Sequence, residues 1–116
     1  MMLMYRLKYK LWIDKDGKAF GKGPLVLLLG VRDKGSLSEA ARSMNMSYNK
    51  AYNLIKTVEE KLGFKLIASK TGGSKGGGSE LTEEAERLIG IYQAFYEECE
   101  KTLDEIFQRH FGNIQL

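Results

Sequence analysis

The chain has 116 residues, 43% of them hydrophobic and 28% charged, with one cysteine and a formal net charge of +3. This composition predicts one small globular domain, too short to include a second domain of ordinary size. Because Cys99 is the only cysteine, the chain cannot form an internal disulfide. The longest apolar run, residues 25–29, is too short to span a membrane, and the first residues do not resemble a signal peptide. We therefore expect a cytoplasmic protein that does not enter membranes.

The charges are distributed unevenly along the chain. Residues 1–79 contain 15 Lys or Arg and six Asp or Glu, whereas residues 80–116 contain three and nine. A basic region joined to an acidic one is typical of a protein in which one part faces a polyanion such as nucleic acid. An uneven distribution on so small a surface can also arise by chance, so charge alone does not decide between these interpretations.

Residues 5–20 predict an N-terminal β-hairpin. Apolar residues alternate with charged ones from Tyr5 to Ile13, which is the period of a half-buried strand. The segment 14–17 favours a turn, and residues 18–20 suit a short return strand.

Three helices are predicted next. Pro24 suits the first turn of a helix that Gly35 ends. Ser36 and Glu39 then form a capping box, in which the Ser36 hydroxyl accepts from the Glu39 amide and the Glu39 carboxylate reaches back. Two further helices follow, over residues 37–44 and 48–62.

The segment that begins at Leu37 has the spacing of a helix-turn-helix. Two short helices that cross steeply need small residues where they touch, and Ala40 and Ala41 occupy those positions. The turn needs a residue that tolerates positive φ, to which Asn45 is suited. The other positions that this arrangement buries are all apolar: Met44, Met46, Ala51 and Leu54. Any amphipathic helical hairpin would satisfy several of these requirements, so the spacing favours the motif and leaves that simpler alternative open.

The second helix of this motif would expose a polar face with no acidic residue before Glu59. Hydrogen-bonding side chains and one cation can read base edges and contact phosphates. The alternative is an ordinary solvated helix face, which usually includes acidic residues. Either tyrosine on this face could instead bury its ring and expose only its hydroxyl group. The predicted face consists of Ser47, Tyr48, Asn49, Tyr52, Asn53 and Lys56.

Residues 64–81 predict a β-hairpin wing, in which strands over 64–67 and 80–81 flank a glycine-rich loop at 72–78. The loop does not match a nucleotide-binding phosphate loop, because Lys75 precedes the glycine cluster and no helix follows it. We expect the wing and the start of the first motif helix to contact phosphates or the minor groove. The residues predicted for these contacts are Ser36, Ser38, Lys70, Thr71 and Lys75.

No catalytic or metal site is predicted. The one histidine, His110, lies near the end of an amphipathic helix, eleven residues after the one cysteine, Cys99, and no second pair of ligands accompanies them. The acidic residues between 97 and 105 fit a solvated helix face. We therefore expect a protein that is not an enzyme and that needs no cofactor.

Residues 83–116 are the predicted dimerisation segment, and a single long helix is predicted in it from Glu83 to about Phe111. At a rise of 1.5 Å per residue it would be roughly 43 Å long, which exceeds the width of so small a domain. Part of its apolar stripe must then extend beyond the domain and needs a partner, so we predict a homodimer through this helix. The residues predicted for the interface are Ile89, Tyr92, Tyr96, Cys99, Leu103 and Ile106.

Several short segments carry a family resemblance: Gly35-Ser36, Ala40-Ala41, Met46-Ser47-Tyr48 with Ala51, the glycine-rich residues 71–78, and Leu81-Thr82-Glu83-Glu84. From about Tyr5 to Phe95 the chain resembles the N-terminal DNA-binding domain of ModE-type, molybdate-responsive transcription regulators, which are themselves similar to LysR-type winged helices.

This resemblance implies a winged helix, dimerisation and operator binding, usually as a repressor. It places Ser47, Tyr48, Asn49 and Lys50 at the start of the recognition helix, although the family often has Trp where this chain has Tyr52. Family members that sense molybdate do so in C-terminal domains, which this sequence does not include. The resemblance therefore implies a regulator without a molybdate-binding domain of its own, acting alone or with a sensor on another chain.

Together these features predict an α+β fold, with a winged helix-turn-helix over residues 1–82, its helix-turn-helix at 37–62, and a dimerisation helix over 83–116. The predicted function is sequence-specific binding of double-stranded DNA by a transcription regulator. Its operator would be pseudo-palindromic, with two recognition helices entering major grooves about 34–36 Å apart. The alternative is a winged-helix adaptor that pairs with a separate ligand-sensing chain.

Overall fold

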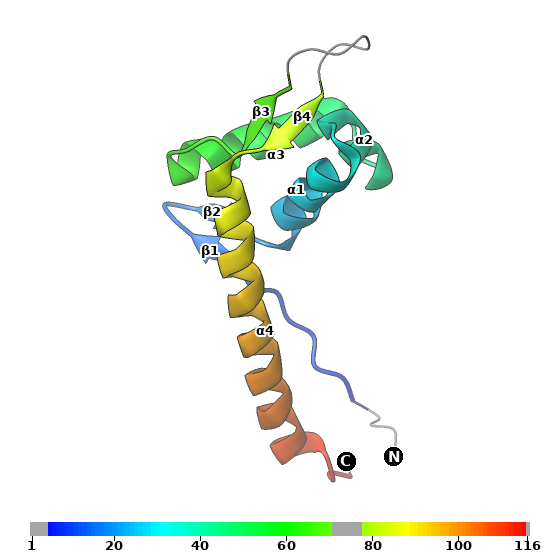
Figure 1. Cartoon of the computed structure of the whole chain (residues 1–116). Coiled ribbons are helices and arrows are strands. Elements are labelled where there is room, and N and C mark those ends of the chain that lie inside the picture. Colours follow the sequence, from blue (N-terminus) through cyan, green and yellow to red (C-terminus); the bar gives the residue numbers. More distant parts are fainter. Residues whose placement is uncertain (1–4, 71–77, 116) are drawn as a thin grey trace.

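Three helices form the head of the molecule: α1 (Lys22–Lys34), α2 (Leu37–Ser43) and α3 (Tyr48–Leu62). A fourth helix, α4 (Glu83–Phe111), extends far out of this head, so the molecule measures 62 × 29 × 21 Å (Figure 1). The computed structural model describes residues 5–70 and 78–115. Within these ranges it has the predicted winged-helix arrangement of helices and two hairpins.

The ends of the helices follow from local capping. The Ser36 hydroxyl accepts from the amide of Glu39 at 3.1 Å, as predicted, and the Glu39 carboxylate lies 3.3 Å from Arg42. Ser47 caps α3 in the same way, accepting from Lys50 at 3.1 Å. Between α2 and α3, Asn45 has a φ of +54°, which confirms the left-handed turn predicted from this residue type.

Small residues set the close contact between α1 and α2. Ala40 and Ala41 are fully buried, and Gly30 of α1 lies directly against Ala40. This contact lets α1 and α2 pack closely. The helix-turn-helix spacing predicted small residues for the contact of α2 with α3, and Ala40 and Ala41 also share the core with Ala51 and Ile55 of α3. The rest of the core is apolar and comes from all four helices and the strands: Phe20, Leu27, Leu28, Val31, Leu37, Ala51, Ile55, Val58, Leu66, Ala85, Ile89 and Tyr92.

The N-terminal hairpin is shorter than predicted. Strand β1 (Ile13–Asp14) pairs antiparallel with β2 (Lys18–Phe20), whereas residues 5–12 are extended but form no strand. These residues run alongside the outer half of α4 (Figure 1). The helix supplies the burial that a neighbouring strand would have given: the Tyr9 ring lies 6.2 Å from that of Tyr96, and the Tyr92 hydroxyl donates to the Leu11 carbonyl at 2.6 Å.

The predicted wing is a two-stranded antiparallel hairpin of β3 (Ile67–Ser69) and β4 (Ser79–Leu81), with Ala68 opposite Glu80. The strand predicted for residues 64–67 begins three residues later, at Ile67. Leu66, just before it, is buried in the core, and its carbonyl accepts from the Thr82 amide at 3.0 Å. The tip of the predicted wing, with Thr71 and Lys75, lies outside the described residues.

Helix α4 has the boundaries that the sequence predicted. Thr82 caps its start, accepting from the Ala85 amide at 3.1 Å while donating to the Lys65 carbonyl at 2.7 Å. An ion pair of 2.5 Å between Arg32 and Glu86 joins α1 to the first turn of α4. Among the helices in the described ranges, none combines the length and the apolar character needed to cross a membrane.

Candidate nucleic-acid interface

The outer face of α3 exposes two tyrosine rings, for which the sequence had left both a surface and a core position open. Tyr48 is 51% exposed and Tyr52 is 42% exposed, so neither ring belongs to the core. Their rings are stacked, with centroids 6.1 Å apart and planes inclined by 28°. The two rings form an exposed aromatic surface, and their two hydroxyl groups can donate and accept hydrogen bonds.

Polar side chains surround this aromatic surface. Asn49, Lys50 and Asn53 are exposed on the same helix, and Lys56 is half-buried. The Lys56 ammonium lies 5.3 Å from the centre of the Tyr52 ring. No acidic residue occurs in α3 before Glu59, so the exposed first three turns of the helix carry positive charge and neutral hydrogen-bonding groups.

The serines predicted to contact phosphates lie at helix starts. Ser36 and Ser47 use their oxygen atoms to cap α2 and α3, and each hydroxyl keeps a hydrogen to donate. Ser38 is exposed on the first turn of α2. Free backbone amides and the positive end of the helix dipole favour an anion at such positions.

The base of the wing is fixed against the turn between α1 and α2. The Ser79 amide donates to the Gly35 carbonyl at 2.9 Å, and the Lys70 amide donates to the Gly78 carbonyl at 3.0 Å. A Cβ atom at position 78 would collide with the Gly35 carbonyl oxygen, so only glycine fits there. Because this contact holds the hairpin beside α2, the exposed Lys70 belongs to the same end of the molecule as α3 (Figure 1).

Sequence reasoning missed Glu59, which is 6% exposed. Its Oε2 atom accepts from the amides of Leu66 at 2.7 Å and Ile67 at 3.4 Å, and its Oε1 atom lies 3.3 Å from the Lys56 ammonium. Burial tends to raise the pKa of this carboxyl, but the two amide donors and Lys56 outweigh it and lower the pKa below its usual 4.5. Glu59 is therefore ionised at neutral pH. The only sequence signal was a glutamate at an otherwise apolar helix position.

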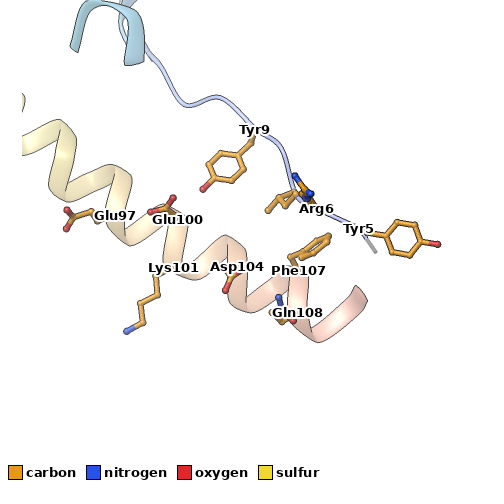
Figure 2. Close-up of a pocket in the computed structure, with 10 residues that line it drawn as sticks. Tyr5, Arg6, Tyr9, Glu97, Glu100, Lys101, Asp104, Phe107 and Gln108 are labelled. Atoms are coloured by element: carbon orange, nitrogen blue, oxygen red, sulfur yellow. The ribbon is translucent and has the colours of Figure 1, made fainter. Parts of the chain in front are cut away.

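A wide groove lies on another part of the molecule. It has a volume of about 630 Å³ and runs between residues 5–9 and the outer half of α4 (Figure 2). Arg6 and Lys101 share its walls with acidic side chains, among them Glu100 and Asp104. Within the described ranges, no three His, Cys, Asp or Glu side chains lie close enough together to hold a metal ion.

The residues predicted for a dimer interface divide into two groups. Ile89 and Tyr92 are buried in the core of their own chain, and Tyr92 packs edge-on against Phe20 with ring centroids 5.2 Å apart. They are therefore not available to a partner. Further along α4, Tyr96, Cys99 and Leu103 are half-buried and Ile106 is exposed. Two exposed apolar residues near this second group, Ile91 and Phe95, were not in the predicted set.

Solved structures with the same arrangement include two described as DNA complexes. The CbnR_DBD–DNA complex aligns with a TM-score of 0.58 over 76% of this chain and 95% of that chain, at 18% identity. The BenM_DBD/benA site 1 DNA complex aligns with a TM-score of 0.56 over 78% and 97%, at 16% identity. These likenesses confirm the winged-helix fold.

Curated relatives include several ModE proteins. "Molybdenum transport protein ModE" of Azotobacter vinelandii is 29% identical over 109 residues, which cover 93% of this chain and 40% of that protein. "Transcriptional regulator ModE" of Yersinia pestis is 32% identical over 109 residues, covering 91% and 38%. "DNA-binding transcriptional dual regulator ModE" of Escherichia coli K12 is 29% identical over 104 residues, covering 90% and 37%. The chain thus spans about 40% of the length of these relatives.

Residues 24–86 match the family described as "Bacterial regulatory helix-turn-helix protein, lysR family". The match begins at the first turn of α1 and ends in the first turn of α4, so it includes α2, α3 and the wing. Together with the ModE relatives, it confirms the predicted resemblance to the helix-turn-helix domains of ModE and LysR proteins. The chain belongs to the lysR family of bacterial regulatory helix-turn-helix proteins.

Proposed function

We propose that this chain binds double-stranded DNA in a sequence-dependent way, as a homodimeric transcription regulator. The observation that carries the proposal is the exposed outer face of the first three turns of α3, which has stacked tyrosines, two asparagines and two lysines but no acidic side chain before Glu59. Such side chains suit base edges in a major groove: asparagine can make two hydrogen bonds to adenine, and aromatic rings can contact the methyl group of thymine.

Two further contacts would position the protein without reading sequence. Ser36 and Ser38 at the start of α2 offer hydrogen-bond donors to phosphates, and Lys70 at the base of the wing offers a cation. These groups lie together, because the Lys70 ammonium approaches Gly35, the residue before Ser36. We expect them to contact one stretch of the DNA backbone beside the groove that α3 enters. We include Thr71 and Lys75 of the wing tip in this set on the sequence alone.

We propose that the dimer forms through the apolar side of α4 from Ile91 to Ile106. Ile91, Phe95 and Ile106 are exposed there although they are apolar, and Cys99 and Leu103 lie half-buried between them. Their helical positions differ from those that face residues 5–9 in Figure 2, so this side of the helix is open to a partner. A two-fold pair of such helices would place two copies of α3 on a pseudo-palindromic site.

Repression is the proposed sign of regulation, and it rests on the family resemblance alone. One relative is named a dual regulator, so the sign needs its own measurement. A promoter fused to a reporter gene should give more product when the gene for this chain is deleted. Less product on deletion would instead identify an activator. A regulator of this kind would work in the cytoplasm, with the DNA.

The binding proposal is tested by fluorescence anisotropy with duplexes selected by the protein, at several stated salt concentrations. Asn49→Ala and Asn53→Ala should each weaken binding to the selected site by about 1–3 kcal/mol and relax its specificity, whereas Asn113→Ala, on the far end of the chain, should do neither. Lys70→Ala should weaken binding to all sequences and reduce the salt slope by about one, whereas Lys15→Ala should not. Equal effects of test and control variants would contradict the assignment.

A further inference from the structure

Glu59 is the one buried charged side chain that the described residues contain, and it lies where α3 meets the wing. The carboxylate comes from the fourth turn of α3, and both of its amide donors, Leu66 and Ile67, belong to the first residues of the wing. These hydrogen bonds cross from the helix to the hairpin. They therefore connect the two elements that the proposed function brings to DNA.

Leu66 connects α3 to the wing. Its amide donates to Glu59, its carbonyl accepts from Thr82 at 3.0 Å, and its side chain is fully buried in the core. If Glu59 were absent, the Leu66 amide would lose its acceptor, and with it a hydrogen bond from the wing to α3. The pairing of β3 with β4, the contact of Ser79 with Gly35 and the burial of the Leu66 side chain would remain.

The charge of Glu59 is balanced by two lysines that approach it from different sides. The Lys56 ammonium is 3.3 Å from Oε1 but not in hydrogen-bonding geometry, and the Lys65 ammonium is 3.8 Å away. Lys56 comes from α3, on the side of the Tyr52 ring, and Lys65 comes from the segment that leads into the wing. One carboxylate therefore attracts a cation from each of the two elements.

We infer that Glu59 is a positioning residue: by accepting from the amides at the start of the wing, it fixes the orientation of the wing relative to α3. The inference rests on the proposed function for its consequence, which is that the contribution of Lys70 to DNA binding depends on Glu59. If Glu59 only stabilised the fold, its replacement would lower the population of folded protein. That loss would weaken DNA binding equally with and without Lys70.

The first test needs no DNA. Amide hydrogen exchange of Leu66 and Ile67 is measured in the wild type, in Glu59→Gln, in Glu59→Ala and in the neighbouring exposed control Glu60→Gln. In Glu59→Ala both amides should exchange at least tenfold faster, while amides in the middle of α4 keep their rates. Glu59→Gln keeps one acceptor oxygen and should give a smaller increase, and Glu60→Gln should give none. Unchanged exchange at both amides in folded Glu59→Ala would overturn the inference; if that variant does not fold, Glu59→Gln decides.

The second test is a double-mutant cycle on DNA binding. Lys70→Ala is compared in the wild type and in Glu59→Gln, with the salt slope of binding as the readout. The slope should fall by about one in the wild type and by less than half as much in Glu59→Gln, with Glu60→Gln behaving as the wild type. The same fall in both backgrounds would overturn the inference while leaving the proposed function intact. If the wild type binds no DNA, the proposed function fails, and the exchange experiment still decides whether Glu59 holds the wing.

Discussion

Replacing Gly30 by alanine tests the close packing of α1 against α2, the first helix of the helix-turn-helix. A Cβ atom at this position would lie 2.9 Å from the Cβ atom of Ala40 and 3.3 Å from its Cα atom, and Ala40 is fully buried. Glycine to alanine within a helix normally stabilises by about 1 kcal/mol, but overpacking a core contact costs about 1–3 kcal/mol. We therefore expect Gly30→Ala to lower the free energy of unfolding by about 1 kcal/mol, measured by urea denaturation.

Gly90 provides the matched control, because a Cβ atom there would meet nothing within 4 Å. Gly90→Ala should raise the free energy of unfolding by about 1 kcal/mol. The double variant Gly30→Ala/Ala40→Gly moves one methyl group from α2 to α1 and should return close to the wild type, although Ala40→Gly alone costs roughly 2 kcal/mol in helix propensity and lost burial. If Gly30→Ala stabilises as much as Gly90→Ala, or if the two single effects simply add, the close contact of α1 and α2 does not exist as described.

Three further changes test other parts of the structure. Tyr92→Phe removes the hydrogen bond to the Leu11 carbonyl and should destabilise the protein by about 1 kcal/mol in urea denaturation, whereas a change near zero would argue against this attachment of the N-terminal segment. Gly78→Ala should break the contact with Gly35 and increase proteolysis at the base of the wing, and an unchanged cleavage rate would count against it. Because the pKa of Glu59 in the folded protein lies below its unfolded value near 4.5, the ionised carboxylate stabilises the fold above pH 4.5, and this stabilisation is lost as the pH falls below it. Glu59→Gln should therefore flatten the pH dependence of the unfolding midpoint below pH 4.5. An identical pH profile in the variant would contradict the direction of the pKa shift.

The helices and their ends could be predicted from sequence because their determinants are local. Ser36, Ser47 and Thr82 each cap a helix with a hydrogen bond to an amide three residues on, and the pattern is visible in the chain itself. Asn45 adopts positive φ for a similarly local reason. The exposed face of α3 follows from the same periodicity, since burying Ala51 and Ile55 turns Asn49 and Asn53 outward.

Long-range contacts account for what the sequence did not reveal. The alternation from Tyr5 to Ile13 has the period of a strand, but the packing partner of this segment is α4, more than 80 residues away, and a helix cannot complete a strand ladder. Tyr92 is likewise buried in its own chain by a residue distant in sequence, Phe20, against which its ring packs. The role of Glu59 could not be predicted because its partners are backbone amides, which almost every residue has whatever its side chain.

Selection of bound sites from random duplex DNA, at a stated salt concentration, tests the central claim most directly. The account predicts an inverted repeat whose half-site centres lie one helical turn apart, about 34–36 Å. It also predicts that selection with Asn49→Ala loses discrimination at one base pair in each half-site. Failure of the wild type to enrich any site at low salt, or an enriched site that Asn49→Ala and Asn53→Ala both leave unchanged, would contradict the assignment of α3 as the element that reads DNA.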